Sequence, residues 1–128
     1  MPRQAITTGS KFEEMAGYSR AIVDGEWIFI SGTAGYDFSN GTISEEPVEQ
    51  ARQCLATIEG TLREAGADMS DVVRVRLYLS DRSFVESVAR ELGSRFAPPR
   101  PTNTTIICGF ATPEMKVEIE VTALKRAS

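Results

Sequence analysis

The residue types best suited to chemistry lie toward the end of the chain, where Arg100 precedes Glu118. A guanidinium group holds carboxylates in bidentate fashion, and a carboxylate is a candidate acid or base. Polar and apolar residues alternate over 116–123, which is typical of a strand with one buried face. Thr and Ile dominate 102–110, and 111–114 is typical of a turn. We therefore predict an antiparallel hairpin that brings Arg100 close to Glu118.

The absence of histidine limits the chemistry further. It excludes the commonest general base, the commonest zinc ligand and every Ser-His or Cys-His nucleophile pair. Cys54 and Cys108 lie far apart and match no metal or redox spacing, so we interpret both as small buried residues, with a functional thiol as the alternative. Acid–base chemistry is left to a carboxylate, a tyrosine, a lysine or a positioned water.

Length and composition indicate one soluble domain over 1–128. With 128 residues, 41 % hydrophobic and 25 % charged, the chain can bury an ordinary core. No apolar run approaches the roughly 20 residues that cross a bilayer, and the first residues lack the apolar block of a signal peptide. We expect a cytoplasmic protein with no membrane partner. The net charge of −4, without a basic block, argues against nucleic acid as a partner.

The first third of the chain reads mainly as strands. Residues 3–6 suit a short edge strand, and we expect the polar 7–15 to be a loop. Two apolar segments, 19–23 and 26–31, flank Asp24-Gly25, which suits a two-residue hairpin turn. The glycine and hydroxyl residues of 31–35 that follow can bring N–H groups close to a ligand oxygen. For such a loop, a plain flexible connection is the commoner role.

Two amphipathic helices and one further strand complete the pattern. Ser44 can cap a helix that ends near Gly66, with one apolar stripe along it. A capping box from Ser83 to Glu86 predicts a second helix. Between them, 72–79 alternates, with Val73, Val75, Leu77 and Leu79 on one side and Arg74, Arg76 and Tyr78 on the other.

This order of elements predicts an α+β domain in two layers, with a mixed sheet and both helices on one face. The other face of the sheet would carry Arg74, Arg76, Tyr78 and Glu118 or its neighbours. A short chain cannot cover that face itself, so we expect it to associate with other subunits.

Three segments together resemble the RidA/YjgF family across nearly the whole chain: GYSRAIVDGEWIFISGTAG, EQARQCLATIEGTLREAGADMSDVVRVRLYLSD and PEMKVEIEVTA. The resemblance implies a chorismate-mutase-like fold and a homotrimer with a central barrel and clefts between subunits. It implies no metal and no organic cofactor. The best-known members hydrolyse reactive enamines and imines, such as 2-aminoacrylate, to keto acids and ammonia.

The resemblance also assigns residues. Glu118 matches the glutamate that helps to position the attacking water, so it is the catalytic candidate. Tyr18, Ser31 and Gly32 match residues that line the cleft, and Thr104 falls where another lining residue is expected.

The arginine that grips the substrate carboxylate in this family is displaced here. Thr102 stands at its position, and Arg100 lies two residues earlier, as in a subgroup regarded as lacking the deaminase arginine. Two residues along a strand keep a side chain on the same face but move its root by about 7 Å. Arg100 could still reach the substrate, but Pro99 and Pro101 restrict its backbone. A salt bridge or a trimer contact at the cleft rim is the alternative role for Arg100.

Two functional hypotheses follow. In the first, the protein is a hydrolytic deaminase of a small enamine or imine, with Glu118 orienting water and Arg100 or Thr102 meeting the acid end. In the second, it is a non-catalytic trimer that binds a small carboxylate metabolite or a partner protein, and Glu118 is a solvated residue or an ion-pair partner of Arg74 or Arg76. Ribonuclease activity, attached to some family names, is disfavoured by the acidic charge and the lack of histidine.

Overall fold

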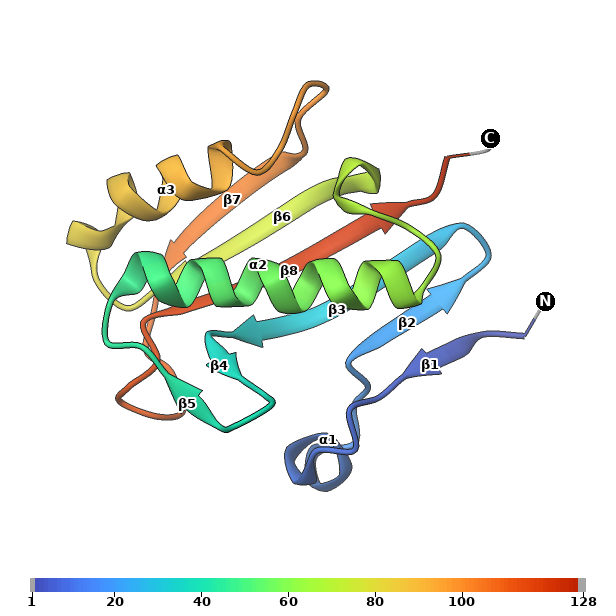
Figure 1. Ribbon diagram of the computed structural model, residues 1–128, viewed down its shortest axis with the longest axis horizontal. Helices are drawn as coiled ribbons and strands as arrows, with labels where there is room; N and C mark the ends of the chain where they lie inside the picture. The colour runs from blue at the N-terminus through green and yellow to red at the C-terminus, as the bar shows by residue number, and fades with distance from the viewer. Residues whose placement is uncertain (1, 127–128) are drawn as a thin grey trace.

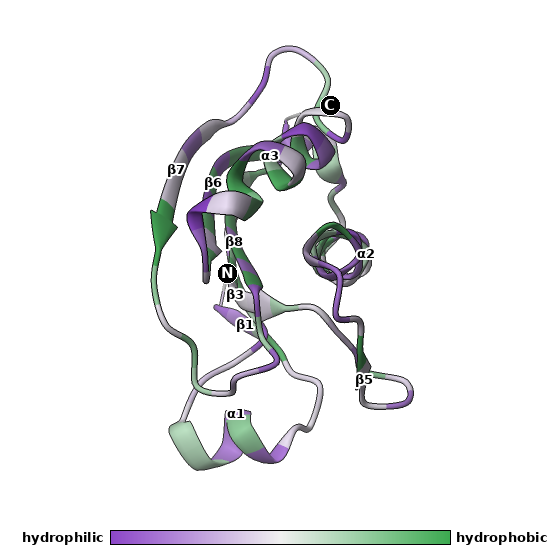
Figure 2. Ribbon diagram, turned by 90° about the vertical axis from the view of Figure 1, so that its left-hand side faces the viewer, coloured by the Kyte–Doolittle hydropathy of each residue, from purple (hydrophilic) through white to green (hydrophobic). Residues whose placement is uncertain are grey.

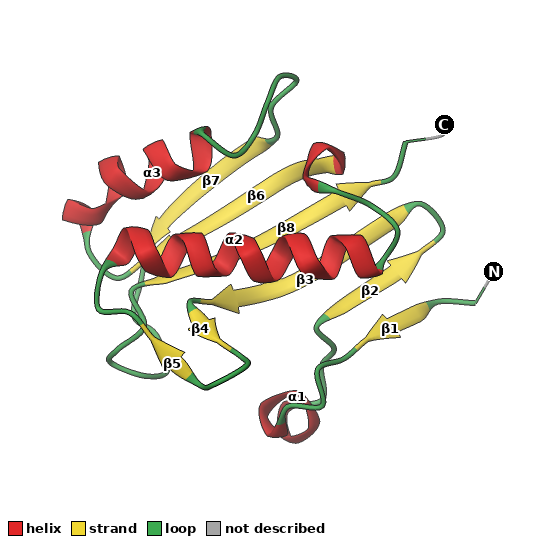
Figure 3. Ribbon diagram, in the orientation of Figure 1, coloured by secondary structure: helices red, strands yellow, loops and turns green. Residues whose placement is uncertain are grey.

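The computed structural model describes residues 2–126. Its main feature is a six-stranded sheet in the order β1-β2-β3-β8-β6-β7, with α2 and α3 on one face (Figures 1 and 3). The strands of this sheet are β1 (Gln4–Ile6), β2 (Ala21–Asp24), β3 (Trp27–Ala34), β6 (Val72–Leu79), β7 (Thr102–Ile107) and β8 (Val117–Leu124). The α-helices are α1 (Lys11–Ala16), α2 (Pro47–Glu64) and α3 (Val85–Gly93), and β4 (Tyr36–Asp37) pairs with β5 (Thr42–Ile43).

The predicted α+β architecture is confirmed. The sheet is mixed, because β6 and β7 run parallel while the other neighbours are antiparallel. Seen nearly edge-on in Figure 2, α2 lies to one side of the strands. Its apolar stripe is buried against the sheet, where Ile28, Leu77 and Ile119 are fully enclosed. Burial of these side chains is the dominant stabilising term of such a fold.

The predicted hairpin between the last two strands is wrong. β7 pairs only with β6 within this sheet order, in parallel, while β8 lies between β3 and β6. The connection 108–116 therefore carries the chain past β6 instead of closing a tight turn. The reason is the difference in burial between the two strands. The alternating apolar residues of β8 are buried, and this strand lies in the middle of the sheet beneath α2. Every residue of β7 is exposed, and this strand lies at the edge. Periodicity identifies a strand but not its neighbour.

Residues 7–15 are not a plain loop, because α1 begins at Lys11. The Ser10 hydroxyl caps this helix by accepting a hydrogen bond from the Glu13 N–H at 3.1 Å. Gly17, with a φ of 74°, ends it in the left-handed region. The sequence pattern did not predict this helix, because its apolar side chains Phe12 and Met15 are exposed and form no stripe that faces the core.

The other predicted elements are present with shifted ends. The β2–β3 hairpin pairs Asp24 with Trp27, and Gly25 has a φ of 60° in the turn. α2 begins at Pro47 after Glu46, and the Ser44 hydroxyl instead accepts from the Glu46 N–H at 3.1 Å.

The second helix is preceded by a short turn of 3-10 helix, Arg82–Phe84. Asp81, and not the predicted Ser83, provides the cap, because its side chain accepts a hydrogen bond from the Ser83 N–H at 2.8 Å. The α-helix proper then begins at Val85, one residue later than the capping box suggested.

The described residues 2–126 leave the face of the sheet opposite α2 and α3 uncovered. Trp27 and Phe29 stack on it with ring centroids 6.2 Å apart and remain 44 % and 45 % exposed. Val73 joins them, contrary to the predicted alternation, because β6 shifts register between Val72 and Arg74 and turns Val73 outward. No helix within residues 2–126 is long and apolar enough to span a bilayer.

Candidate functional site

A hollow of about 660 Å³ opens at one end of the sheet, where β3 finishes and β8 starts. Residues of α1, β4 and the connection before β8 line it. Figure 1 shows where these segments lie in the fold. The residues that line it and bear polar side chains include Tyr18, Arg20, Ser31 and Glu118. Apolar side chains from the surrounding segments complete the wall, namely Phe12, Phe38, Ala111 and Met115. A concave site with a few converging polar groups is the usual form of a small-molecule pocket.

Glu118 reaches the hollow across the surface of Gly32. Its backbone lies opposite Ala34 at the start of β8. A Cβ atom built on Gly32 would lie 2.9 Å from the carboxyl carbon of Glu118 and closer still to Oε1. Glycine is therefore needed at position 32 for space, since the carboxylate occupies the place of a side chain.

The environment of Glu118 suits a proton carrier. Burial raises the pKa of its carboxyl above the ordinary value, while the Arg20 guanidinium opposes the rise and Glu120 adds to it. Within residues 2–126 no hydrogen bond and no ion pair engages this carboxylate. An unpaired carboxyl with a raised pKa holds a proton more readily than an ordinary glutamate, which suits a group that accepts and returns a proton.

Arg20 is a residue of this site that the sequence interpretation did not single out. Its side chain is 5 % exposed, and one terminal nitrogen donates to the Gly32 carbonyl at 2.8 Å. The backbone is fixed as well, because the Ser31 N–H donates to the Arg20 carbonyl at 3.0 Å. A charged residue at the start of an apolar strand, beside a glycine-hydroxyl loop, is the signal that could have identified it.

Two further polar residues that line the hollow, Ser31 and Glu13, have hydrogen-bond partners of their own. The Ser31 hydroxyl donates to the Ser19 carbonyl at 2.6 Å. The Glu13 carboxylate accepts from the Thr8 N–H at 3.2 Å and from the Thr8 hydroxyl at 2.5 Å. Burial alone would raise the pKa of Glu13, but these bonds, Ser10 and the charge of Arg20 lower it overall. Glu13 is thus held as an anion by its own neighbours.

Gln50 positions the start of β8, on which Glu118 lies. Gln50 is fully buried in α2. Its amide nitrogen donates to the Ser44 carbonyl at 2.7 Å and to the Glu114 carbonyl at 2.9 Å. Its amide oxygen accepts from the Lys116 N–H at 2.8 Å and the Val117 N–H at 3.2 Å. The sequence offered no sign of this role, because one Gln in a helix is usually a surface residue.

The predicted site residues divide into two groups. Tyr18, Ser31, Gly32 and Glu118 line the same hollow. Arg100, Thr102 and Thr104 do not line it, so the expected closeness of Arg100 and Glu118 within one chain is wrong. The cause is the strand order, since β7 and β8 are separated by β6.

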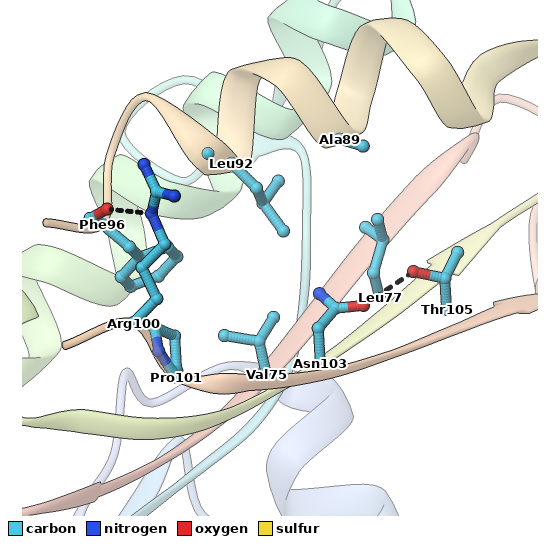
Figure 4. A pocket seen from close by; sticks show the side chains of 10 residues that line it. Val75, Leu77, Ala89, Leu92, Phe96, Arg100, Pro101, Asn103 and Thr105 are labelled. Carbon is cyan, nitrogen blue, oxygen red and sulfur yellow. Dashed lines mark hydrogen bonds between the residues drawn. The ribbon is translucent and has the colours of Figure 1, made fainter. Parts of the chain in front are cut away.

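The residues around β7 have contacts of their own. Arg100 donates from Nε to the Phe96 carbonyl at 3.2 Å and lines a separate hollow of about 230 Å³ between α3 and the sheet (Figure 4). The Thr102 hydroxyl donates to the Val73 carbonyl at 3.2 Å, and Thr104 pairs with Arg76 of β6.

Of the two predicted ion-pair partners of Glu118, Arg74 has a hydrogen bond elsewhere. Arg74 donates to the Thr122 hydroxyl at 3.2 Å, and the Tyr78 hydroxyl donates to Glu120 at 3.1 Å. No ion pair joins Glu118 to Arg74 or Arg76 in the part of the chain that the structure describes. Over the same residues, no cluster of Cys, Asp and Glu is arranged to hold a metal ion.

Sequence and structure comparisons agree on the family of the chain. The family model described as Endoribonuclease L-PSP matches residues 8–125. A RutC family protein, y4sK of Sinorhizobium fredii, is 31 % identical over 118 residues, which cover 91 % of this chain and 94 % of the relative. The crystal structure of Rv2704 from Mycobacterium tuberculosis, a member of the YjgF/YER057c/UK114 family, is 33 % identical with a TM-score of 0.86, covering 96 % and 99 % of the two chains.

A further solved structure shows the same fold at lower identity. RidA from the Antarctic bacterium Psychrobacter sp. PAMC 21119 superposes with a TM-score of 0.81 at 24 % identity, covering 94 % of this chain and 93 % of its own. Together with the matched residues 8–125, these likenesses show that the chain belongs to the L-PSP family, the group that also carries the names YjgF, RidA and RutC.

Proposed function

We propose that this protein hydrolyses a small enamine or imine to a keto acid and ammonia in the hollow around Glu118. The observation that carries the proposal is the Glu118 carboxylate itself, which lies over Gly32, has a pKa raised by burial and has no hydrogen-bond partner within residues 2–126. Membership of a family that includes RidA supports the same reaction.

The reaction needs only water and one proton carrier. Protonation of an enamine at carbon gives the iminium ion, and water then adds to the carbon of its C=N bond. Glu118 accepts a proton from that water as the new C–O bond forms. The same proton passes to the nitrogen of the resulting carbinolamine. The C–N bond then breaks and ammonia leaves, while a C=O bond forms as the hydroxyl group gives its proton to the Glu118 carboxylate. That proton replaces the one taken up by the enamine carbon, so that atoms and charge balance without any redox step.

The proposal includes a homotrimer whose clefts lie between subunits. The bare face of the sheet supports it, because Trp27, Phe29 and Val73 form an exposed apolar surface there. In such an assembly the hollow of one copy would face β7 of the next. Under that arrangement Arg100, Thr102 and Thr104 would reach the substrate from a neighbouring copy, and this role stays a prediction.

The direct test is imine hydrolysis by the purified protein. An imine generated in the cuvette by an amino-acid oxidase should yield keto acid faster with the protein than in buffer. Glu118→Gln keeps the shape of the side chain but cannot accept the proton, so it should reduce the acceleration by about 10²-fold or more. Glu86→Gln, which changes a remote exposed carboxylate of α3, is the matched control and should retain full activity.

A second candidate function is binding of a small carboxylate metabolite without turnover. It is favoured by Thr102 at the position of the usual arginine and by Arg100, which contacts Phe96 and lies outside the hollow. The discriminating result is saturable binding of a keto acid by calorimetry, with no acceleration of imine hydrolysis by the same preparation. In that case Glu118→Gln should leave the affinity for the keto acid intact.

A further inference from the structure

We propose that Arg20 holds the carboxylate of the ligand in the hollow around Glu118, and so supplies the anion-binding group that Thr102 lacks. For the reaction step this inference rests on the proposed hydrolysis, but for binding it stands by itself. It assigns the ligand to the class of small 2-imino and 2-oxo acids. Such molecules carry a carboxylate next to the carbon that water attacks.

The hydrogen bonding of Arg20 is incomplete. Only 5 % of the residue is exposed, and one terminal nitrogen is used by the Gly32 carbonyl. Its Nε is enclosed and has no partner within residues 2–126. A buried N–H of a charged group without an acceptor is costly, and native structures rarely leave one without a function. The Nε edge of a guanidinium is also the edge that binds a carboxylate side-on.

Arg20 also forms no direct ion pair within residues 2–126. Neither Glu13 nor Glu118 approaches its guanidinium to within ion-pair distance in the described part of the chain. Glu13 directs its carboxylate oxygens to Thr8 instead. The carboxyls of Glu13 and Glu118 interact with the charge of Arg20 only from a distance. The guanidinium therefore keeps hydrogen-bonding capacity for an anion that enters the hollow.

Gly32 sets the distance between the two charged groups. Its carbonyl receives the hydrogen bond of Arg20, and its Cα lies under the Glu118 carboxylate. Both functional groups are thus anchored on one residue. The carboxylate of a 2-imino acid is one bond from its C=N carbon, so a single small molecule can meet Arg20 with one end and Glu118 with the other.

The remaining wall of the hollow describes the rest of the ligand. Phe12, Phe38 and Met115 line it, and none of them offers a strong hydrogen bond. These side chains favour an aliphatic or aromatic substituent over a polar one. We therefore assign the ligand class as small 2-imino or 2-oxo acids with an apolar side chain.

The test is calorimetric binding of 2-oxobutanoate, a stable product analogue. Arg20→Gln should weaken its affinity about 10- to 100-fold, the loss expected when a charge-assisted bidentate contact is removed. Arg20→Lys keeps the charge but lacks the planar guanidinium, so its affinity should lie between those of wild type and Arg20→Gln. Arg90→Gln, which changes an exposed arginine of α3, is the matched control and should bind normally. Unchanged affinity in Arg20→Gln would overturn the proposal.

A second measurement uses the wild-type protein alone and so does not depend on the folding of any variant. The amide of 2-oxobutanoate has the same shape but no charge, and it should bind at least about 10-fold more weakly than the acid. A crystal structure with 2-oxobutanoate should place a carboxylate oxygen within hydrogen-bond distance of Arg20 Nε. Equal affinity for acid and amide, or a carboxylate bound elsewhere, would refute the assignment.

Activity separates this inference from the proposed hydrolysis. If 2-oxobutanoate binds through Arg20 but no imine is hydrolysed, the anion site is supported and the proposed hydrolysis is refuted. If imines are hydrolysed and Arg20→Gln leaves KM unchanged, the proposed hydrolysis is supported and the role of Arg20 in carboxylate binding is refuted. A positioning role limited to Gly32 would lower kcat without raising KM, whereas carboxylate binding predicts a raised KM.

Discussion

The carboxylate of Glu118 occupies the space that a side chain at position 32 would fill. A Cβ atom on Gly32 would lie 2.9 Å from Glu118 Cδ, well inside any real contact distance. Gly32 has no positive φ that would by itself demand glycine. Its lack of a side chain therefore serves the glutamate, and the pair fixes where the proposed proton carrier lies.

We expect Gly32→Ala to displace the Glu118 carboxylate, because the added methyl group and the carboxyl cannot share the space. A shift of about 1 Å at a positioned catalytic group can cost on the order of 10²-fold in rate. The measurement is kcat/KM for imine hydrolysis, together with thermal denaturation to show that the variant is folded.

Gly60→Ala in α2 is the control for this substitution, because nothing lies within 4 Å of a Cβ at that position. It should stabilise the protein by about 0.5–1 kcal/mol through helix propensity and leave the rate unchanged. Full activity in Gly32→Ala would show that the position of the glutamate does not govern the reaction.

The raised pKa of Glu118 predicts a pH-dependent contribution to stability. The folded protein binds this proton more tightly than the unfolded chain, whose glutamate titrates near 4.5. The stabilisation is therefore complete below that value and is lost as pH rises through the folded pKa. Glu118→Gln has no such proton, so its stability relative to wild type should increase as pH rises from 4.5 through the folded pKa of Glu118.

Denaturant unfolding at several pH values measures this difference. Glu86→Gln, at an exposed site, should show a stability difference from wild type that changes little over the same range. A constant difference for Glu118→Gln would contradict the burial of this carboxyl.

Local periodicity predicted most of the elements but not the order of the strands. The strands 72–79 and 116–123 and both long helices follow from apolar residues that recur along their own segment. Strand order does not follow, because β7 and β8 choose neighbours by burial across the whole sheet. The predicted meeting of Arg100 and Glu118 failed with the hairpin on which it depended.

Half of the site was accessible from the sequence, since Tyr18, Ser31, Gly32 and Glu118 do line one hollow. They were identified through the family resemblance, with the glycine loop as a weak local signal. Arg20 was missed because its importance lies in an unsatisfied Nε, which no sequence pattern reveals. Polar groups that bond to distant backbone atoms leave no periodic signal in the chain.

Gln50 is the clearest case of such a long-range contact, and it carries its own prediction. Gln50→Ala should leave the backbone groups of Ser44, Glu114, Lys116 and Val117 without their partner. Loss of these buried bonds should cost about 3–5 kcal/mol of unfolding free energy. Urea denaturation of wild type and Gln50→Ala measures this difference in unfolding free energy.

The control for Gln50→Ala is Gln53→Ala on the same helix, where one bond of 3.4 Å to Thr57 is lost. It should change stability by less than about 0.5 kcal/mol. If the two variants proved equally stable, the bonds of Gln50 would not be what holds the connection before β8 against α2.

The bare face of the sheet gives the last prediction. Trp27 and Phe29 stack there in the open, at a cost that association with other copies would remove. Light scattering should therefore give three times the mass of one chain. Phe29→Asp places an unpaired charge in the centre of the proposed interface and should shift the mass to that of a monomer. Met15→Asp, on exposed α1, should leave the mass unchanged. A monomeric wild type that still hydrolysed imines would show that the hollow around Glu118 works without a second copy.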